Sequence, residues 1–243
     1  MTNKKSSFEE TNIPLQKTEN NVSRRKFLTY AGLSATVLGA ASCRKFVIED
    51  EMPGKGPKDN PKNVVNLGSG DIGILNYAYA LEQLEAAFYI KVAANFYSGV
   101  TEKERIYLED IRDHEIVHRE FFKTVLGNKA IGSLDLNFSS INFSSRDSVL
   151  GTAKAFEDLG VSAYNGAGEL LASADNLLLA GKIVSVEARH AATIRDLISY
   201  GSFADSSVVD AMGLDVVRTP PEVLQIAGAF INTKIIANNL PTS

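Results

Sequence analysis

The chain has 243 residues, of which 44% are hydrophobic, so it can bury one sizeable core in a single domain with appendages. Its formal net charge of −4 offers no broad basic surface to a phosphate backbone, which makes nucleic acid a poor candidate partner. The single cysteine, Cys43, excludes a disulfide framework and the paired cysteines of iron–sulfur and rubredoxin modules. Any bound metal must therefore sit on oxygen and nitrogen ligands.

An export signal is predicted at the N-terminus. Residues 23–28, SRRKFL, precede a weakly apolar run rich in Gly, Ala, Ser and Thr, and together they resemble a twin-arginine export signal. The run is shorter than the roughly 20 residues that a bilayer span needs, so a transmembrane anchor is not expected. A basic amphipathic first helix is the alternative, but the stretch has no polar face at helical spacing.

Cys43 ends this predicted signal. Residues 40–43, AASC, resemble a bacterial lipobox, in which the cysteine becomes the lipidated first residue of the mature chain, although Ala40 stands where such sites usually have Leu. Simple cleavage with Cys43 as a bystander is the alternative. We expect a signal peptide over 1–43, a lipid anchor at Cys43, and export to the periplasm or cell envelope. Residues 44–70, rich in Pro, Gly, Lys and Asp, are predicted to be a flexible linker.

Four amphipathic stretches follow within residues 71–200. Asp71 is the expected N-cap of the first helix, and Thr101 with Glu104 forms a capping box for the second. The predicted spans are 71–97, 101–127, 147–171 and 175–200. The connection 127–145 can span a helix about 40 Å long in extended conformation, so the second and third helices can run in the same direction. The sequence thus predicts an all-α four-helix bundle with one long crossover between the second and third helices.

Residues 201–243 are expected to form a C-terminal extension. Within it, residues 219–222, TPPE, place a capping Thr, two prolines and a Glu in the order that opens a helix. We therefore predict a short fifth helix that packs on the bundle.

Each predicted bundle helix carries a glutamate in the middle of its apolar stripe. The four are Glu82, Glu115, Glu157 and Glu187. His118 and His190 follow two of them by three residues, which puts both groups of each Glu-x-x-His on one helical face. Burying an ionised carboxylate without a partner costs several kcal/mol, and four that face one another would also repel. Two divalent ions would balance the four negative charges, with both histidines binding as neutral imidazoles.

The helices also repeat in pairs. Glu82 precedes Tyr89 by seven residues, Glu157 precedes Tyr164 by the same step, and a Glu-x-x-His follows each about thirty residues later. Two such hairpins, related by a pseudo-twofold axis, would bring six ligands to one point. Tyr89 and Tyr164 are candidates to hydrogen-bond the opposite Glu or His, or to act as redox-active phenols; core packing is the equal alternative.

The sequence is also compatible with purely structural roles for these residues. The glutamates could lie at the edge of the core and pair with arginines, for which the candidates are Arg112, Arg119, Arg189 and Arg195. Glu85 lies about 60° off the ligand direction, which favours a rim or salt-bridging residue over an extra ligand. His114 lies about 100° from Glu115 and is expected at the surface.

These residues resemble the ferritin-like superfamily, in which a Glu on helices one and three and a Glu-x-x-His on helices two and four bind two metals. Several short sequence segments are similar to those of bacterial ferritin-like proteins that are grouped with desiccation-related proteins. Segments that carry this likeness are 71–78, 84–89, 161–167, 186–192 and 219–224. The resemblance covers about residues 71–230. It implies that Glu115 and Glu187 bridge the ions and that Glu82 and Glu157 are terminal ligands.

The sequence favours an oxidoreductase that holds two Fe or two Mn ions. Both metals suit oxygen-rich sites and cycle between +2 and +3, so the expected partners are metal ions and small oxidants such as O₂ or peroxide, with Fe²⁺ as a further substrate. A non-catalytic envelope protein that sequesters metal or acts in desiccation or oxidative stress is the alternative, and a scaffold with an empty site is a third. Whether the chain is a monomer or a homodimer stays open.

Overall fold

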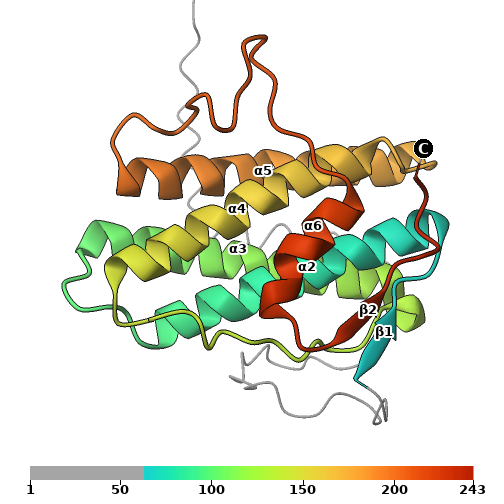
Figure 1. The fold of residues 1–243 in the computed structure, drawn as a ribbon, viewed down its shortest axis with the longest axis horizontal. Helices are drawn as coiled ribbons and strands as arrows, with labels where there is room; N and C mark the ends of the chain where they lie inside the picture. The colour runs from blue at the N-terminus through green and yellow to red at the C-terminus, as the bar shows by residue number, and fades with distance from the viewer. Residues whose placement is uncertain (1–62, 243) are drawn as a thin grey trace, which may run out of the picture. The chain divides into compact units, whose positions relative to one another are not determined.

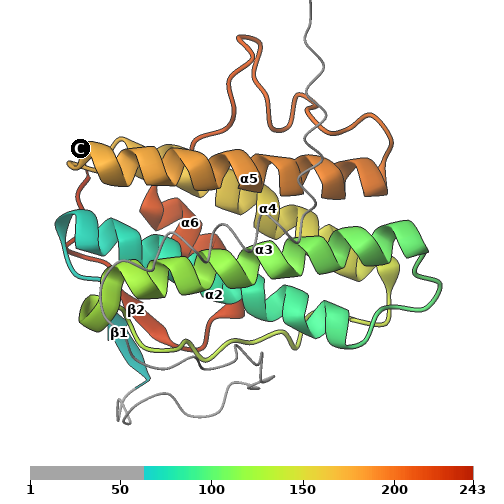
Figure 2. The same ribbon diagram turned by 180° about the vertical axis from the view of Figure 1, so that it is seen from behind.

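The structure is a computed structural model that describes residues 63–242; the predicted signal peptide, Cys43 and most of the predicted linker lie outside this range. Four long helices form a bundle, and a short helix and a two-stranded sheet lie against it (Figures 1 and 2). The elements in order are β1 (Val64–Asn66), α2 (Gly70–Ala94), α3 (Glu102–Leu126), η1 (Gly127–Lys129), α4 (Arg146–Gly168), α5 (Ala174–Ile198), α6 (Pro220–Ala227), η2 (Gly228–Phe230) and β2 (Lys234–Ile236). None of the helices within 63–242 has the length and hydropathy of a bilayer span.

Local capping sets where the helices begin. At the start of α3, the Thr101 hydroxyl accepts from the Glu104 amide at 3.2 Å and the Glu104 carboxylate accepts from the Thr101 amide at 2.8 Å, which confirms the predicted capping box. The predicted N-cap of α2 is wrong: Ser69 holds that position and Asp71 lies in the first turn. The Asp71 carboxylate instead accepts from the amides of Ala172 and Ser173, so it ties the start of α2 to the start of α5.

Two antiparallel hairpins, α2 with α3 and α4 with α5, make up the bundle, and the segment between α3 and α4 runs along its length as predicted (Figure 1). Two polar side chains of α2 hold this crossover. Asn76 donates to the Lys129 carbonyl at 2.9 Å and accepts from the Ile131 amide at 2.9 Å. Gln83 accepts from the Leu134 amide at 2.9 Å. The backbone groups of an irregular segment are thereby satisfied where it lies against the core.

The folded domain begins before the predicted linker ends. β1 pairs in parallel with β2, in the register Val64 with Lys234 and Asn66 with Ile236, and Leu67 is fully buried. The prediction of a flexible linker up to Gly70 is therefore wrong for its last residues. Three-residue strands show no periodicity that a sequence pattern could detect, and β1 acquires its partner only from the far end of the chain.

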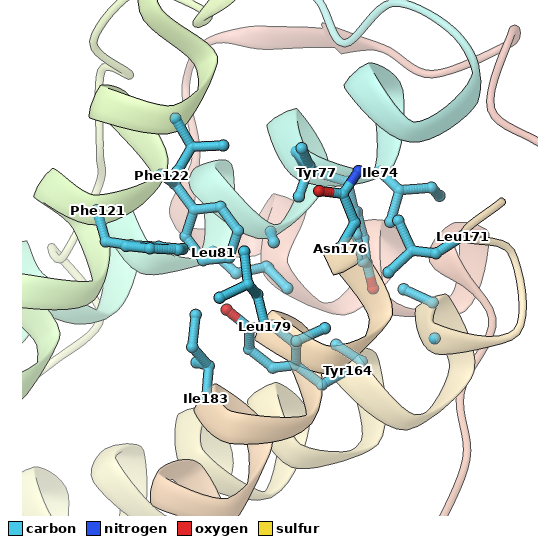
Figure 3. Close-up of a pocket in the computed structure, with 17 residues that line it drawn as sticks. Ile74, Tyr77, Leu81, Phe121, Phe122, Tyr164, Leu171, Asn176, Leu179 and Ile183 are labelled. Carbon is cyan, nitrogen blue, oxygen red and sulfur yellow. The ribbon is translucent and has the colours of Figure 1, made fainter. Parts of the chain in front are cut away.

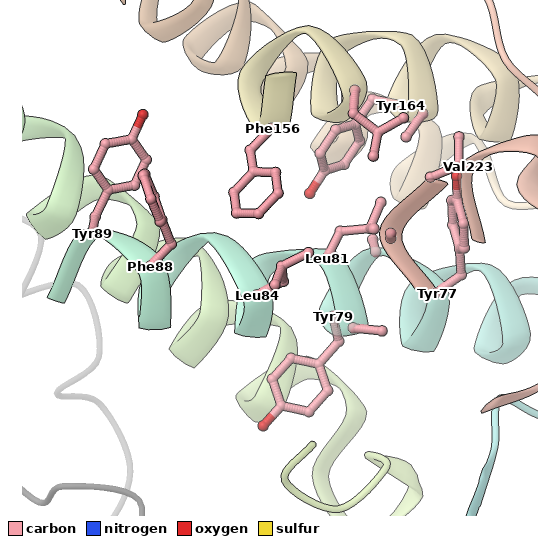
Figure 4. Packing of buried hydrophobic residues seen from close by; sticks show 14 of the residues in the cluster. Tyr77, Tyr79, Leu81, Leu84, Phe88, Tyr89, Phe156, Tyr164 and Val223 are labelled. Carbon is pink, nitrogen blue, oxygen red and sulfur yellow. The ribbon is translucent and has the colours of Figure 1, made fainter. Parts of the chain in front are cut away.

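Aromatic side chains of α2 and α4 pack in the core (Figure 4). The Phe88 ring packs edge-on against Phe156, with centroids 5.2 Å apart, and Phe156 in turn contacts Phe230 at 4.8 Å. Val223 and Ala227 of α6 are fully buried, so the predicted fifth helix does pack on the bundle. Such contacts keep water away from the centre of the bundle.

The chain after α5 makes a close approach to α4 at Gly166. A Cβ built on Gly166 would lie 1.9 Å from the carbonyl oxygen of Arg218, whose amide donates to Ser162 at 3.1 Å. We expect Gly166→Ala to lower the free energy of unfolding by about 2–3 kcal/mol, because this backbone segment must shift. Gly151→Ala in the same helix meets no atom within 4 Å and should stabilise the protein by about 0.5–1 kcal/mol. Urea denaturation gives the free energy of unfolding of both variants. Equal changes in the two variants would contradict the predicted difference.

Candidate metal centre

Six side chains from four helices converge in the middle of the bundle. The four glutamates are 0% exposed, and His118 and His190 are 8% and 4% exposed. Their ligand atoms form two groups, each within 4.8 Å: Glu82, Glu115, His118 and Glu187 in one, and Glu115, Glu157, Glu187 and His190 in the other. Since Glu115 and Glu187 belong to both groups, the arrangement is a pair of candidate cation positions joined by two carboxylates.

The two halves repeat the same distances. His118 Nδ1 lies 2.8 Å from Glu187, 3.5 Å from Glu82 and 3.8 Å from Glu115. His190 Nδ1 lies 2.8 Å from Glu115, 3.5 Å from Glu157 and 3.8 Å from Glu187. The pseudo-twofold relation expected from the sequence repeat thus extends to the side chains.

Most of the ligand atoms at this centre lack hydrogen-bond partners within the protein. Within residues 63–242, ten buried side-chain polar atoms have no hydrogen-bond partner, and eight of them belong to this cluster. They are Glu82 Oε2, both oxygens of Glu115 and of Glu187, Glu157 Oε2, and Nδ1 of His118 and His190. A buried polar atom without a partner costs about 1–3 kcal/mol, and the short nitrogen–oxygen separations lack hydrogen-bond angles. Atoms that point at a common centre in this way fit hard or borderline cations.

Each tyrosine of the sequence repeat reaches across the bundle. The Tyr89 hydroxyl of α2 donates to Glu157 Oε1 on α4, and the Tyr164 hydroxyl of α4 donates to Glu82 Oε1 on α2. Burial, reinforced by the neighbouring carboxylates, raises the pKa of both phenols well above the usual value, so both stay protonated donors. Each hydrogen bond occupies one oxygen of a carboxylate and leaves the other, Oε2, facing the centre.

A family model of the ferritin-like domain matches residues 70–200, more than half of the chain and all four bundle helices. The chain belongs to this ferritin-like family. No curated protein matches it.

A fifth carboxyl group, that of Glu85, lies beside the centre of the ferritin-like domain. The expectation that Glu85 sits at the rim or in a salt bridge is wrong, because it is 3% exposed and the charges that act on it are those of other carboxylates. Burial first, and then the charges of Glu187 and Glu115, raise its pKa well above the usual value. The sequence held a signal for it, because Glu82-x-x-Glu85 repeats the i, i+3 spacing of the Glu-x-x-His pairs.

Gly160 provides the space that Glu85 occupies. A Cβ on Gly160 would lie 2.9 Å from Glu85 Oε1 and 3.7 Å from Glu187 Oε2. The offset of 75 residues that relates Glu82 to Glu157 also relates Glu85 to Gly160. The pseudo-twofold symmetry of the ferritin-like domain is therefore broken here: one hairpin supplies a carboxyl group, and the other supplies the room for it.

His114 is more than the surface residue that the sequence predicts. Although it lies at the solvent edge, its Nδ1 is 2.9 Å from Nε2 of His190, and the two rings stack with centroids 5.2 Å apart. A hydrogen bond to the outer nitrogen of a ligand histidine fixes the tautomer and the orientation of the ring. His114 is therefore placed to hold His190 with Nδ1 toward the centre.

The arginines suggested as alternative partners of the glutamates all bind elsewhere. Arg195 is buried and makes two 2.7 Å hydrogen bonds to Asp158. The others contact Asp113 (from Arg112), Glu120 (from Arg119) and Ser185 (from Arg189). The interpretation of the four glutamates as edge-of-core salt bridges is thus wrong.

Without a bound cation, the two histidines provide the positive charge of the site. Burial by itself would lower the pKa of His118, but the close carboxylates of Glu115, Glu187 and Glu82 outweigh it and raise the pKa to about 12. Burial would likewise raise the pKa of Glu187, but its contacts with His118 and His190 lower it to about 2. Metal ions and protons therefore compete for the same atoms.

Proposed function

We propose that this protein is an exported oxidoreductase that holds two Fe or two Mn ions and acts on a small oxidant, O₂ or peroxide, or on Fe²⁺. The observation that carries the proposal is the cluster of eight unpartnered ligand atoms, which divides into two groups with two shared carboxylates. In this proposal Glu115 and Glu187 bridge the ions, Glu82 with His118 completes one position, and Glu157 with His190 completes the other. The four carboxylates then neutralise two dications.

The residues around the centre support redox chemistry. A bound Fe or Mn pair supplies one-electron steps between the +2 and +3 states. Tyr89 and Tyr164 hold the terminal carboxylates in fixed orientations, and the aromatic packing around Phe88 excludes water. Glu85 offers a further carboxyl group that can hold or release a proton beside Glu187.

The N-terminal features belong to the same proposal. A twin-arginine signal over residues 1–43 carries folded proteins across the membrane, so the metals could be loaded before export. Lipidation at Cys43 would then keep the ferritin-like domain at the cell envelope in the periplasm. The likeness to desiccation-related proteins supports a role under drying or oxidative stress.

Elemental analysis of protein purified with its export signal intact tests this proposal. Two Fe or two Mn ions per chain are expected, together with consumption of peroxide or oxidation of Fe²⁺ by the loaded protein. A protein that binds two metals and does neither would instead be a metal-sequestering envelope protein. A protein that binds no transition metal would overturn both roles.

Removal of one tyrosine hydroxyl should impair turnover and leave the metals in place. In Tyr164→Phe, all six ligands remain but Glu82 loses the donor that orients it, and changes of this kind cost about 10–100-fold in activity or metal affinity. Tyr79→Phe is the matched control, because Tyr79 lies on α2 but points away from Tyr164 and Tyr89 (Figure 4). Steady-state rates and metal content of both variants give the comparison. Equal rates would contradict a role for the Tyr164 hydroxyl.

A further inference from the structure

A narrow apolar cavity opens at the end of the bundle where α2 and α5 begin and α3 and α4 end (Figure 3). Residues of all four helices line the cavity. One of them, Val125, is 44% exposed, so the cavity opens at the protein surface. The volume that a water-sized molecule can occupy is about 20 Å³. This is room for about one small molecule and too little for a ring or a chain.

The inner wall of the cavity borders the metal centre. Three lining residues lie one helical turn from a candidate ligand: Ala78 before Glu82, Phe122 after His118, and Ile183 before Glu187. Tyr164, which donates to Glu82, lines the cavity as well (Figure 3). The cavity wall therefore includes a direct hydrogen-bond partner of one candidate ligand and residues one helical turn from three of them.

The cavity exists because the two hairpins differ in side-chain size. The offset of 75 residues between α2 and α4 makes Ala163 the counterpart of Phe88, and Leu81 the counterpart of Phe156. Around Tyr89 the two phenylalanines pack against each other and fill the space (Figure 4). Around Tyr164 the smaller Ala163 and Leu81 line the cavity instead. One half of a near-symmetric core is thus closed and the other is open.

The polar groups of the cavity wall are few and mostly engaged. Asn176 donates to Asp71 at 2.7 Å, and the Tyr164 proton goes to Glu82. Among the lining residues this leaves the hydroxyl of Tyr77 as a buried polar atom without a partner in the described range. Hydrogen peroxide would lose most of its hydrogen bonds to water on entry, whereas a nonpolar diatomic molecule loses none.

We propose that this cavity is a binding site for dioxygen, which it delivers to the Tyr164 side of the metal centre. The proposal rests on the proposed redox function and deepens it, because it makes O₂ rather than peroxide the oxidant that enters by this path. It also makes the two metal positions unequal, since on the Tyr89 side Phe88 and Phe156 fill the space that corresponds to this cavity.

Xenon is the probe of the site, because it occupies small apolar cavities and needs no metal. Crystals of the metal-free protein under xenon pressure should show a xenon atom between Ala163, Phe122 and Tyr164. Ala163→Leu, which fills the cavity, should abolish it, and Ala163→Val serves if the leucine variant does not fold. Ala155→Leu makes the same chemical change at an exposed position of α4 and should leave the xenon in place. The absence of xenon from the wild-type cavity would overturn the proposal.

The loaded protein supplies the second measurement. Ala163→Leu should raise the O₂ concentration that gives half-maximal Fe²⁺ oxidation several-fold, while the rate driven by added peroxide stays as in the wild type. An unchanged O₂ dependence with xenon excluded would overturn the role of the cavity in oxygen entry. Xenon binding by a protein without any oxidation activity would support the site and refute the redox function, so the two failures can be told apart.

Discussion

Replacement of Glu115 or Glu187 by alanine is expected to remove both metal ions, whereas replacement of Glu82 or Glu157 is expected to remove about one. The reason is that Glu115 and Glu187 belong to both groups of ligand atoms, while each terminal glutamate belongs to one. Metal content per chain, measured at the same free metal concentration, distinguishes the two classes. The variants should remain folded, because each removes one of several mutually repelling carboxylates.

Glu109→Ala is the control for this series, since Glu109 lies on α3 outside the buried residues of that helix. It should keep two ions. Equal losses in all four variants, or one ion retained by Glu115→Ala, would contradict the assignment of the bridging carboxylates.

The metal-free protein is expected to lose stability as the pH rises from about 5 to 8, and metal loading should reverse this trend. The folded pKa of His118 is raised to about 12, so its contribution is complete below the unfolded value of 6.5 and is lost as the pH rises toward 12. The pKa values of Glu115 and Glu85 are raised well above 4.5, so their contributions fade above about pH 4.5. Glu187, whose pKa is lowered to about 2, contributes fully above pH 4.5 and does not oppose the trend.

For each proton that the folded state binds in excess of the unfolded state, the free energy of unfolding falls by about 1.4 kcal/mol per unit rise in pH. Metal ions displace these protons and bind more tightly as the pH rises, which stabilises the loaded protein in the same range. Urea midpoints between about pH 5 and 8, with chelator and with excess Mn²⁺, measure both slopes. Glu85→Gln keeps the shape of the neutral side chain and should flatten the slope of the metal-free protein. Parallel slopes with and without Mn²⁺ would refute the competition between metal ions and protons.

Helical spacing explains why so much of the fold and site was predictable. The i, i+3 spacing puts Glu115 and His118 on one face wherever the helix goes, and an acid at the middle of an apolar stripe needs a partner in any bundle. The capping box at Thr101 and the crossover length are local properties of the chain as well. These features follow from residues that are close in the sequence.

The features that the sequence did not predict depend on contacts between distant segments of the chain. The burial of Glu85 depends on Gly160, which lies on the other hairpin. His114 is exposed as predicted, but its contact with His190, 76 residues away, was not predicted. Asp71 has its partners at the start of α5 rather than in its own helix. An angle on a helical wheel gives the direction of a side chain, but only the neighbouring helix decides whether that direction is buried.

The short sheet has a consequence for when folding can finish. β1 lies near the start of the described residues, yet it pairs with β2 near their end, and the Lys234 amide donates to the Asn63 carbonyl. The pairing of β1 with β2 forms last, because β2 must be synthesised before its hydrogen bonds can offset the loop-closure entropy of joining such distant segments. A ribosome-bound chain therefore holds β1 without its partner strand β2 until residues 234–236 emerge. An export route that accepts only finished folds would wait for that event.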